Sequence, residues 1–121
     1  MGTGQILTTR IDARNGVTRI ALTGELDMAT APQLQDQISD LLEKGRTRLV
    51  FDLAEVSFCD STGLSVFVRA KNSTDDAGGV VRLAAPQRGV LRILEVSGLV
   101  EVLHTYPSVD EAVTAEEPAL D

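Results

Sequence analysis

The stretch from Arg48 to Leu64 decides the fold class of this 121-residue chain. It begins with Arg48-Leu49-Val50-Phe51-Asp52-Leu53, whose short continuous apolar run is typical of a strand buried on both faces. It ends with Asp60-Ser61-Thr62-Gly63-Leu64, where an acidic residue precedes small residues as in a helix N-cap. A buried strand followed by a helix predicts a mostly parallel sheet with helices packed on it.

Upstream of this stretch, the pattern predicts a hairpin and then a helix. Strands are expected over residues 6–12 and 17–23, joined by Asn15-Gly16, which is a strong two-residue turn signal. This antiparallel pair is expected at one edge of the sheet. A loop, Gly24-Glu25-Leu26-Asp27, comes next. Thr30 is then expected to cap a helix, with Gln33 as its reciprocal partner, and Gly45 to end it.

Downstream, strands and helices continue to alternate. The expected elements are a helix from Asp60 to Gly78-Gly79, a strand over 80–85, a helix from Pro86 to Gly98, a short strand over 100–103 and a helix capped by Ser108 with Glu111. The sequence therefore predicts an α/β fold with a mixed, mostly parallel sheet and about four helices.

Composition limits the kinds of function that the chain can have. Hydrophobic residues make up 43% of the sequence, which suits one domain over residues 1–115, followed by an acidic, frayed tail over 116–121. The net charge of −7 and the 3% aromatic content argue against nucleic acid as a ligand. No apolar run of membrane-spanning length and no signal peptide are evident, and Cys59 is the single cysteine. We therefore expect a cytoplasmic protein.

The segment from Ser57 to Gly63 is the candidate for chemistry. Partner and ligand sites in such sheets gather where strands end and helices begin, and residues 25–30 form a second segment of this kind. A phosphate on a hydroxyl at a helix start meets unpaired N–H groups and the positive end of the helix dipole. Taken alone, however, Asp60-Ser61-Thr62 favours a simple capping segment over a phosphorylation site.

Several segments in order resemble the anti-sigma factor antagonists, bacterial proteins built on the STAS domain (sulphate transporter and anti-sigma antagonist). They are Leu22-Thr23-Gly24-Glu25-Leu26-Asp27, Leu49-Val50-Phe51-Asp52-Leu53, Val56-Ser57-Phe58-Cys59-Asp60-Ser61-Thr62-Gly63-Leu64 and Val96-Ser97-Gly98-Leu99. The resemblance covers roughly residues 6–115 and implies a STAS-type fold. This sequence departs from the family pattern at Cys59, where family members often carry a larger apolar residue.

The resemblance also implies a function and a site. Ser61 would be phosphorylated by a partner that is both anti-sigma factor and serine kinase, with Thr62 as a second possible acceptor. Asp27, Asp60, Ser61, Thr62 and Gly63 would form the partner-binding surface. The unphosphorylated form would bind the partner and free a sigma factor, and a serine phosphatase would reset the phosphorylated form. No cofactor, metal or membrane is implied, and the free protein is expected to be a monomer.

Other functions remain as alternatives. A receiver-like phosphoacceptor domain would use acids such as Asp27, Asp52 and Asp60 around magnesium, but the paired acids and the lysine that it needs are missing from the expected places. A STAS interaction module that is never phosphorylated is a second alternative. An enzyme is third, since His104 is the only histidine and has no motif linking it to Ser61. A redox role for Cys59 is a further hypothesis.

Overall fold

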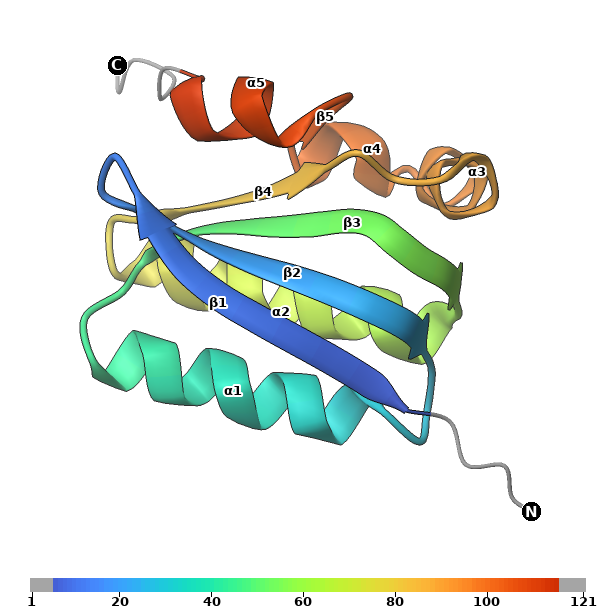
Figure 1. The fold of residues 1–121 in the computed structure, drawn as a ribbon, viewed down its shortest axis with the longest axis horizontal. Helices are drawn as coiled ribbons and strands as arrows, with labels where there is room; N and C mark the ends of the chain where they lie inside the picture. The colour runs from blue at the N-terminus through green and yellow to red at the C-terminus, as the bar shows by residue number, and fades with distance from the viewer. Residues whose placement is uncertain (1–5, 116–121) are drawn as a thin grey trace.

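The computed structural model describes residues 6–115, which form one five-stranded sheet with helices on both faces (Figure 1). The elements in chain order are β1 (Leu7–Arg14), β2 (Val17–Leu26), α1 (Ala31–Glu43), β3 (Arg48–Cys59), α2 (Ser61–Asp76), β4 (Val80–Ala84), α3 (Arg88–Val96), α4 (Leu99–Val102), β5 (Thr105–Tyr106) and α5 (Val109–Thr114). Strands lie side by side in chain order. Only the β1–β2 pair within residues 6–115 is antiparallel, so the predicted mixed, mostly parallel sheet is confirmed.

The predicted hairpin turn is confirmed by its backbone angles. Asn15 has φ 54° and Gly16 has φ 77°, the two positive values that a type I′ turn requires. This turn sets the register of β1 on β2, in which Leu7 lies opposite Gly24 and Arg14 opposite Val17. The hairpin therefore forms the edge of the sheet, as expected.

The sheet is covered unequally on its two faces. Helices α1 and α2 lie together on one face, and α5 lies on the other (Figure 1). Strand β3 contacts both layers: Phe51 packs against Phe67 of α2, with ring centroids 5.0 Å apart, while Val50 packs with Val113 of α5. The continuous apolar run in β3 is thus buried on both faces, as its sequence predicts.

Three boundary predictions are wrong in an instructive way. Residues 24–26 and 57–59 were expected in loops, but β2 extends to Leu26 and β3 extends to Cys59. The two strands stay paired to their ends through two register irregularities, so each segment is held in the sheet by its neighbour despite loop-forming residues such as Gly24 and Ser57. Pro86 lies two residues before the first helical residue, Arg88, instead of opening the helix.

The last strand is also misplaced in the sequence-based prediction. Residues 99–102 form the short helix α4, which Gly98 introduces with a left-handed φ of 78°. The strand β5 follows at Thr105–Tyr106 and pairs with Leu83 and Ala84. The described chain therefore has five helices, one more than expected.

Two further expectations concern the acidic tail and the lack of a membrane-spanning segment. The acidic tail over residues 116–121 lies outside the described residues, as do residues 1–5. Between residues 6 and 115, no helix combines the length and the apolar character needed to cross a bilayer.

Candidate functional site

The two candidate segments lie side by side at the carboxyl edge of the sheet. Leu26 of β2 and Cys59 of β3 are partners in the parallel register, and the backbone N–H of Asp60 donates to the carbonyl of Leu26 at 3.2 Å. The residues that follow each strand are therefore held next to each other. Asp27 begins one segment and Asp60 begins the other.

The start of α2 presents a serine hydroxyl to solvent. Asp60 is extended, and its carboxylate accepts a hydrogen bond from the Gly63 N–H at 3.0 Å. The Leu64 N–H donates to the Asp60 carbonyl at 3.0 Å, which begins the helical ladder. Ser61 is the first helical residue and is exposed, while Thr62 is half-buried. Asp60 is therefore the N-cap that the sequence predicts, and it positions Ser61.

Gly63 allows the helix start to lie against the strand ends. It is buried, and a Cβ placed on it would lie 2.7 Å from Leu26 Cγ and 2.9 Å from both Leu26 O and Cys59 Sγ. These separations are shorter than any normal non-bonded contact, so a side chain at this position would push α2 away from β2 and β3. Gly63 thus sets the height of Ser61 above the sheet.

Asp27 shapes its own loop, which corrects the prediction that Thr30 and Gln33 form a capping box. The Asp27 Oδ1 accepts hydrogen bonds from the N–H groups of Ala29 at 2.9 Å and Thr30 at 3.1 Å. The Thr30 hydroxyl instead accepts from the Asp27 N–H and donates to the carbonyl of Glu25. The Gln33 side chain donates to the Leu7 carbonyl. These bonds fix a second acidic residue, Asp27, beside the α2 start.

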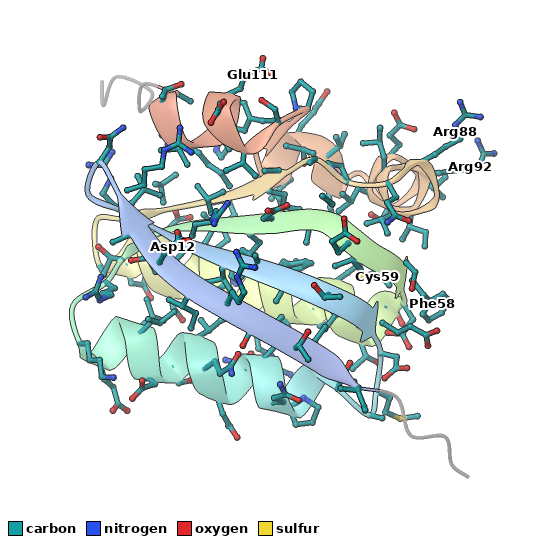
Figure 2. The ribbon with its side chains drawn as sticks, viewed as in Figure 1. Asp12, Phe58, Cys59, Arg88, Arg92 and Glu111 are labelled. Carbon is teal, nitrogen blue, oxygen red and sulfur yellow. The ribbon has the colours of Figure 1, made fainter. Side chains whose placement is uncertain are left out.

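Cys59 lies beneath the site with its thiol turned inward. Its relative exposure is 1%, and burial raises the pKa of its thiol to about 12, with a smaller contribution from the negative charge of Asp60. Phe58, the preceding residue, is 47% exposed at the same end of β3 (Figure 2). A thiol that stays protonated and covered is a poor nucleophile, which argues against the redox hypothesis.

Two serines and one arginine extend the site along α2. Ser61, Ser65 and Arg69 are spaced four residues apart, so they lie on one face of the helix, and all three are exposed. We call these three residues the α2 ridge. The Ser65 hydroxyl donates to the Ser61 carbonyl at 2.9 Å. Ser65 and Arg69 are not among the residues predicted from the sequence, although their four-residue spacing from Ser61 is a signal that could have indicated them.

The α2 ridge separates two open grooves. The first has a volume of about 550 Å³ and lies between α1 and α2; beside the ridge, its lining includes Met28, Ala31, Pro32, Gln35, Asp36, Thr62 and Val66. The second, of about 440 Å³, lies between α2 and α4; beside the ridge, its lining is Leu64, Val68 and Leu99. Both grooves therefore combine an apolar wall with the polar ridge.

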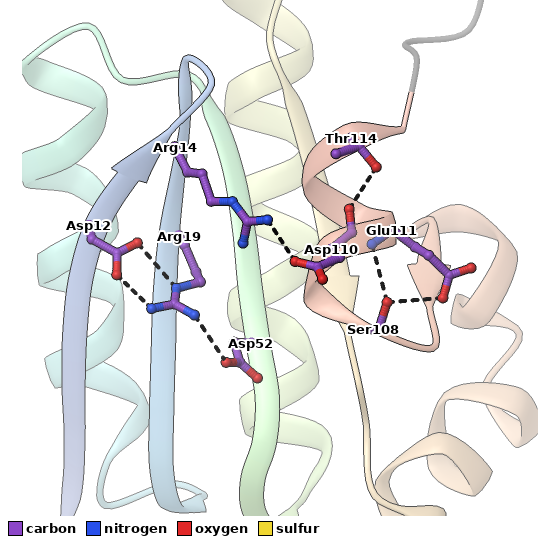
Figure 3. A network of polar contacts seen from close by, with 8 residues as sticks. All are labelled: Asp12, Arg14, Arg19, Asp52, Ser108, Asp110, Glu111 and Thr114. Carbon is purple, nitrogen blue, oxygen red and sulfur yellow. Dashed lines mark hydrogen bonds and ion pairs between the residues drawn. The ribbon is translucent and has the colours of Figure 1, made fainter.

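The acids proposed for a receiver-like magnesium site are not gathered together. Asp52 alternates with Phe51 along β3, so it faces away from α2, and its Oδ2 lies 4.0 Å from Arg19 Nη1 (Figure 3). Arg19 also binds Asp12, with an Nη2–Oδ2 distance of 2.6 Å, and this bond holds the pKa of Asp12 below its usual value. No cluster of three metal-binding side chains occurs within residues 6–115.

The strand order argues against the receiver-like alternative, and the contacts of His104 argue against the enzyme alternative. The order β1-β2-β3-β4-β5, with an antiparallel edge, differs from the 2-1-3-4-5 parallel order of receiver domains. The carbonyl of His104 accepts from Leu83, which pairs with Phe51 of β3. No hydrogen bond between residues 6 and 115 links the His104 side chain to Ser61, so the described structure contains no Ser-His pair of the kind that an enzyme would need.

Comparisons with known proteins agree with this architecture. The family model described as the STAS domain matches residues 8–112, and the chain therefore belongs to the STAS domain family. The chain is 32% identical over 85 residues to the anti-sigma-B factor antagonist of Bacillus subtilis, covering 70% of this chain and 77% of that protein. The resemblance seen in the sequence is confirmed.

Two further relatives come from mycobacteria. The chain is 27% identical over 110 residues to the anti-sigma-F factor antagonist RsfB of Mycobacterium tuberculosis, covering 89% of this chain and 88% of that one. The crystal structure of an anti-sigma factor antagonist from Mycobacterium paratuberculosis superposes with a TM-score of 0.83 at 30% identity, over 91% of this chain and 93% of the other. Similarity thus extends over nearly the whole described chain.

Proposed function

We propose that this STAS protein is an anti-sigma factor antagonist. In its unphosphorylated form it binds an anti-sigma factor through the α2 start, which frees a sigma factor. The single observation that carries the proposal is the exposed Ser61, which begins a helix capped by Asp60 and lies next to the Asp27 segment at the carboxyl edge of the sheet. The relatives named above, which are themselves antagonists, support it.

In this proposal Ser61 is the switch. The partner is both anti-sigma factor and serine kinase, and it positions the Ser61 hydroxyl against ATP that the partner holds. The γ-phosphoryl group moves to the Ser61 oxygen, the serine proton is lost, and ADP leaves. This chain supplies the acceptor hydroxyl and the docking surface, so it acts as a substrate and not as an enzyme.

Phosphorylation opposes rebinding through charge. A phosphoserine adds nearly two negative charges, next to Asp60 and near Asp27, on the surface that the partner contacts. Like charges brought together in an interface weaken it strongly. Because Ser61 is exposed and Asp60 already caps the helix, a phosphate at this position requires no rearrangement of the fold. A serine phosphatase then restores the binding form, and all three proteins act in the cytoplasm.

The proposal predicts nucleotide-dependent capture of the partner. The full-length chain is used to retain proteins from its source cells in the presence of ADP or ATP, followed by phosphosite mapping. With ADP, we expect an anti-sigma factor to be retained. With ATP, we expect phosphate on Ser61 and loss of the partner.

Substitutions at the switch provide the controls. Ser61→Ala should retain the partner with either nucleotide, because no acceptor hydroxyl remains, and Ser61→Asp should retain little. Thr62→Ala, with Ser61 intact, should behave like the unaltered chain. Equal retention of Ser61→Ala and Ser61→Asp would show that the switch is not at this residue, and failure of the unaltered chain to retain any anti-sigma factor would overturn the proposed function.

A further inference from the structure

The proposed partner surface has a shape that extends beyond the α2 start. Ser61 is the first of three residues of the α2 ridge, and each of them lines both grooves. Any partner that covers the Ser61 hydroxyl closely must also meet the ridge and the walls on either side of it. The ridge and its two grooves continue for two helical turns along α2, past the motif that the sequence identifies.

The groove walls favour apolar side chains from the partner. Met28 is 75% exposed on the first groove, where its flexible side chain can adapt to an incoming group. The second groove is walled by Leu64, Val68 and Leu99. Met28 is exposed, and Val68 and Leu99 are half-buried, so each side of the ridge presents some apolar surface that a partner can cover.

Arg69 gives this surface a positive charge at its far end. The chain as a whole carries a net charge of −7, and Asp27 and Asp60 lie at the other end of the ridge. Among residues 6–115, the observed ion pairs do not involve Arg69, so its guanidinium group is available to a partner. Asp36 lines the first groove only, whereas Arg69 lines both.

We propose that the anti-sigma factor straddles the α2 ridge, with apolar side chains in both grooves and an acidic side chain paired with Arg69. The inference rests on the proposed function and adds to it a second contact, two turns from the switch. Ser61 controls whether binding occurs, and Arg69 helps select which anti-sigma factor binds. A charged pair at an interface acts mainly on selectivity and on the association rate.

The shape of the surface is tested by a bulky residue on the ridge. Affinity for the purified anti-sigma factor, identified by the retention experiment above, is measured with ADP for Ser65→Tyr. We expect a loss of about tenfold or more, because the ring blocks the grooves on both sides. Ser73→Tyr is the matched control: Ser73 is exposed on the same helix and lines neither groove, so binding should be unchanged. Equal affinities for the two variants would overturn the straddling arrangement.

The contact made by the Arg69 charge is tested by reversing that charge and then restoring binding with a compensating change in the partner. Arg69→Glu should weaken binding by about tenfold or more and should change its dependence on salt. Arg92→Glu, on the exposed side of α3 and outside both grooves, is the control (Figure 2). Reversing one acidic residue of the partner to lysine should restore binding to Arg69→Glu only. If the unaltered chain binds and Arg69→Glu binds equally well, this inference fails while the proposed function stands; if the unaltered chain does not bind, both fail.

Discussion

Gly63 connects the chemistry of the site to the packing of the sheet at the scale of a single residue. Because Gly63 has no side chain, Leu26 and Cys59 can pack directly against its backbone. This close packing of α2 on the strand ends leaves Ser61, two residues earlier, at the surface. A sequence motif that looks like a phosphoacceptor segment is therefore also a packing requirement. The two roles can be separated because the glycine is buried and the serine is exposed.

Substitution of Gly63 should destabilise the fold. Gly63→Ala introduces a methyl group where three atoms lie within 2.9 Å, and we expect a loss of about 1–3 kcal/mol in the free energy of unfolding. Gly89→Ala is the control, because Gly89 lies in α3 with no heavy atom within 4 Å of the added carbon. That variant should be neutral or gain about 0.5–1 kcal/mol. Urea denaturation followed by circular dichroism measures both, and equal stability of Gly63→Ala and the unaltered chain would refute the packing role.

The Cys59 thiol provides a pH-dependent prediction. Because burial raises its pKa from the ordinary value of 9.0 to about 12, the folded protein retains the thiol proton at pH values where an exposed thiol loses it. Stability should therefore fall as pH rises from about 9 towards 12. Cys59→Ser, whose hydroxyl does not titrate in this range, should lose less stability over the same interval.

The same buried thiol should resist reagents in the folded state. A disulfide reagent at pH 8 should modify Cys59 only at the rate of unfolding, and a sulfenic acid trap, with hydrogen peroxide added as the oxidant, should label the protein only after denaturant is added. Rapid labelling of the folded protein would contradict this account and would revive a redox role.

Helix α2 is the element on which the site depends, and its first turn is held by the Asp60 carboxylate. Asp60→Ala removes the acceptor for the Gly63 N–H, and we expect a loss of about 1 kcal/mol in unfolding free energy. Asp60→Asn keeps an acceptor and removes the charge, so its stability should stay close to that of the unaltered chain. Thermal unfolding at neutral pH distinguishes the two, and equal losses would mean that charge, not hydrogen bonding, holds the helix start.

Elements differed in how well the sequence predicted them. The Asn15-Gly16 turn and the buried run in β3 were predicted correctly, because each depends on local properties: positive φ and continuous apolar character. The ends of β2 and β3 were predicted wrongly, because their pairing comes from the neighbouring strand and is not encoded in either segment alone. The cap at the start of α1 involves four residues in a loop, and Thr30 alone suggested a simpler arrangement.

In the candidate site, too, features set by local sequence were predicted and features set by tertiary contacts were not. Asp60 and Ser61 were identified because capping is a short-range signal, and the resemblance to STAS proteins added Asp27. The α2 ridge was missed because its neighbours come from α1 and α4, which only the folded chain brings to it. Helical spacing could have grouped Ser61, Ser65 and Arg69, but it could not show that grooves lie on both sides.

At the scale of the whole molecule, the STAS fold places the candidate site at one edge of the sheet, where the parallel strands end. The carboxyl ends of β2 and β3 bring two acidic segments together. The antiparallel strand β1 pairs with β2 and forms one edge of the sheet. In the proposed switch, phosphate on Ser61 would change the charge of this edge without requiring a change in the layers beneath it. Under the proposed function, a small domain of this kind would change its binding through an exposed group without refolding.

The central claim is that phosphate on Ser61 decides whether the anti-sigma factor binds. The most direct test is the dissociation constant for the purified anti-sigma factor, measured by isothermal titration calorimetry for the unphosphorylated chain and for the chain fully phosphorylated on Ser61. We predict affinity at least about a hundredfold weaker for the phosphorylated form, with part of the loss recovered in phosphorylated Asp60→Asn. Equal dissociation constants for the two forms would contradict the account.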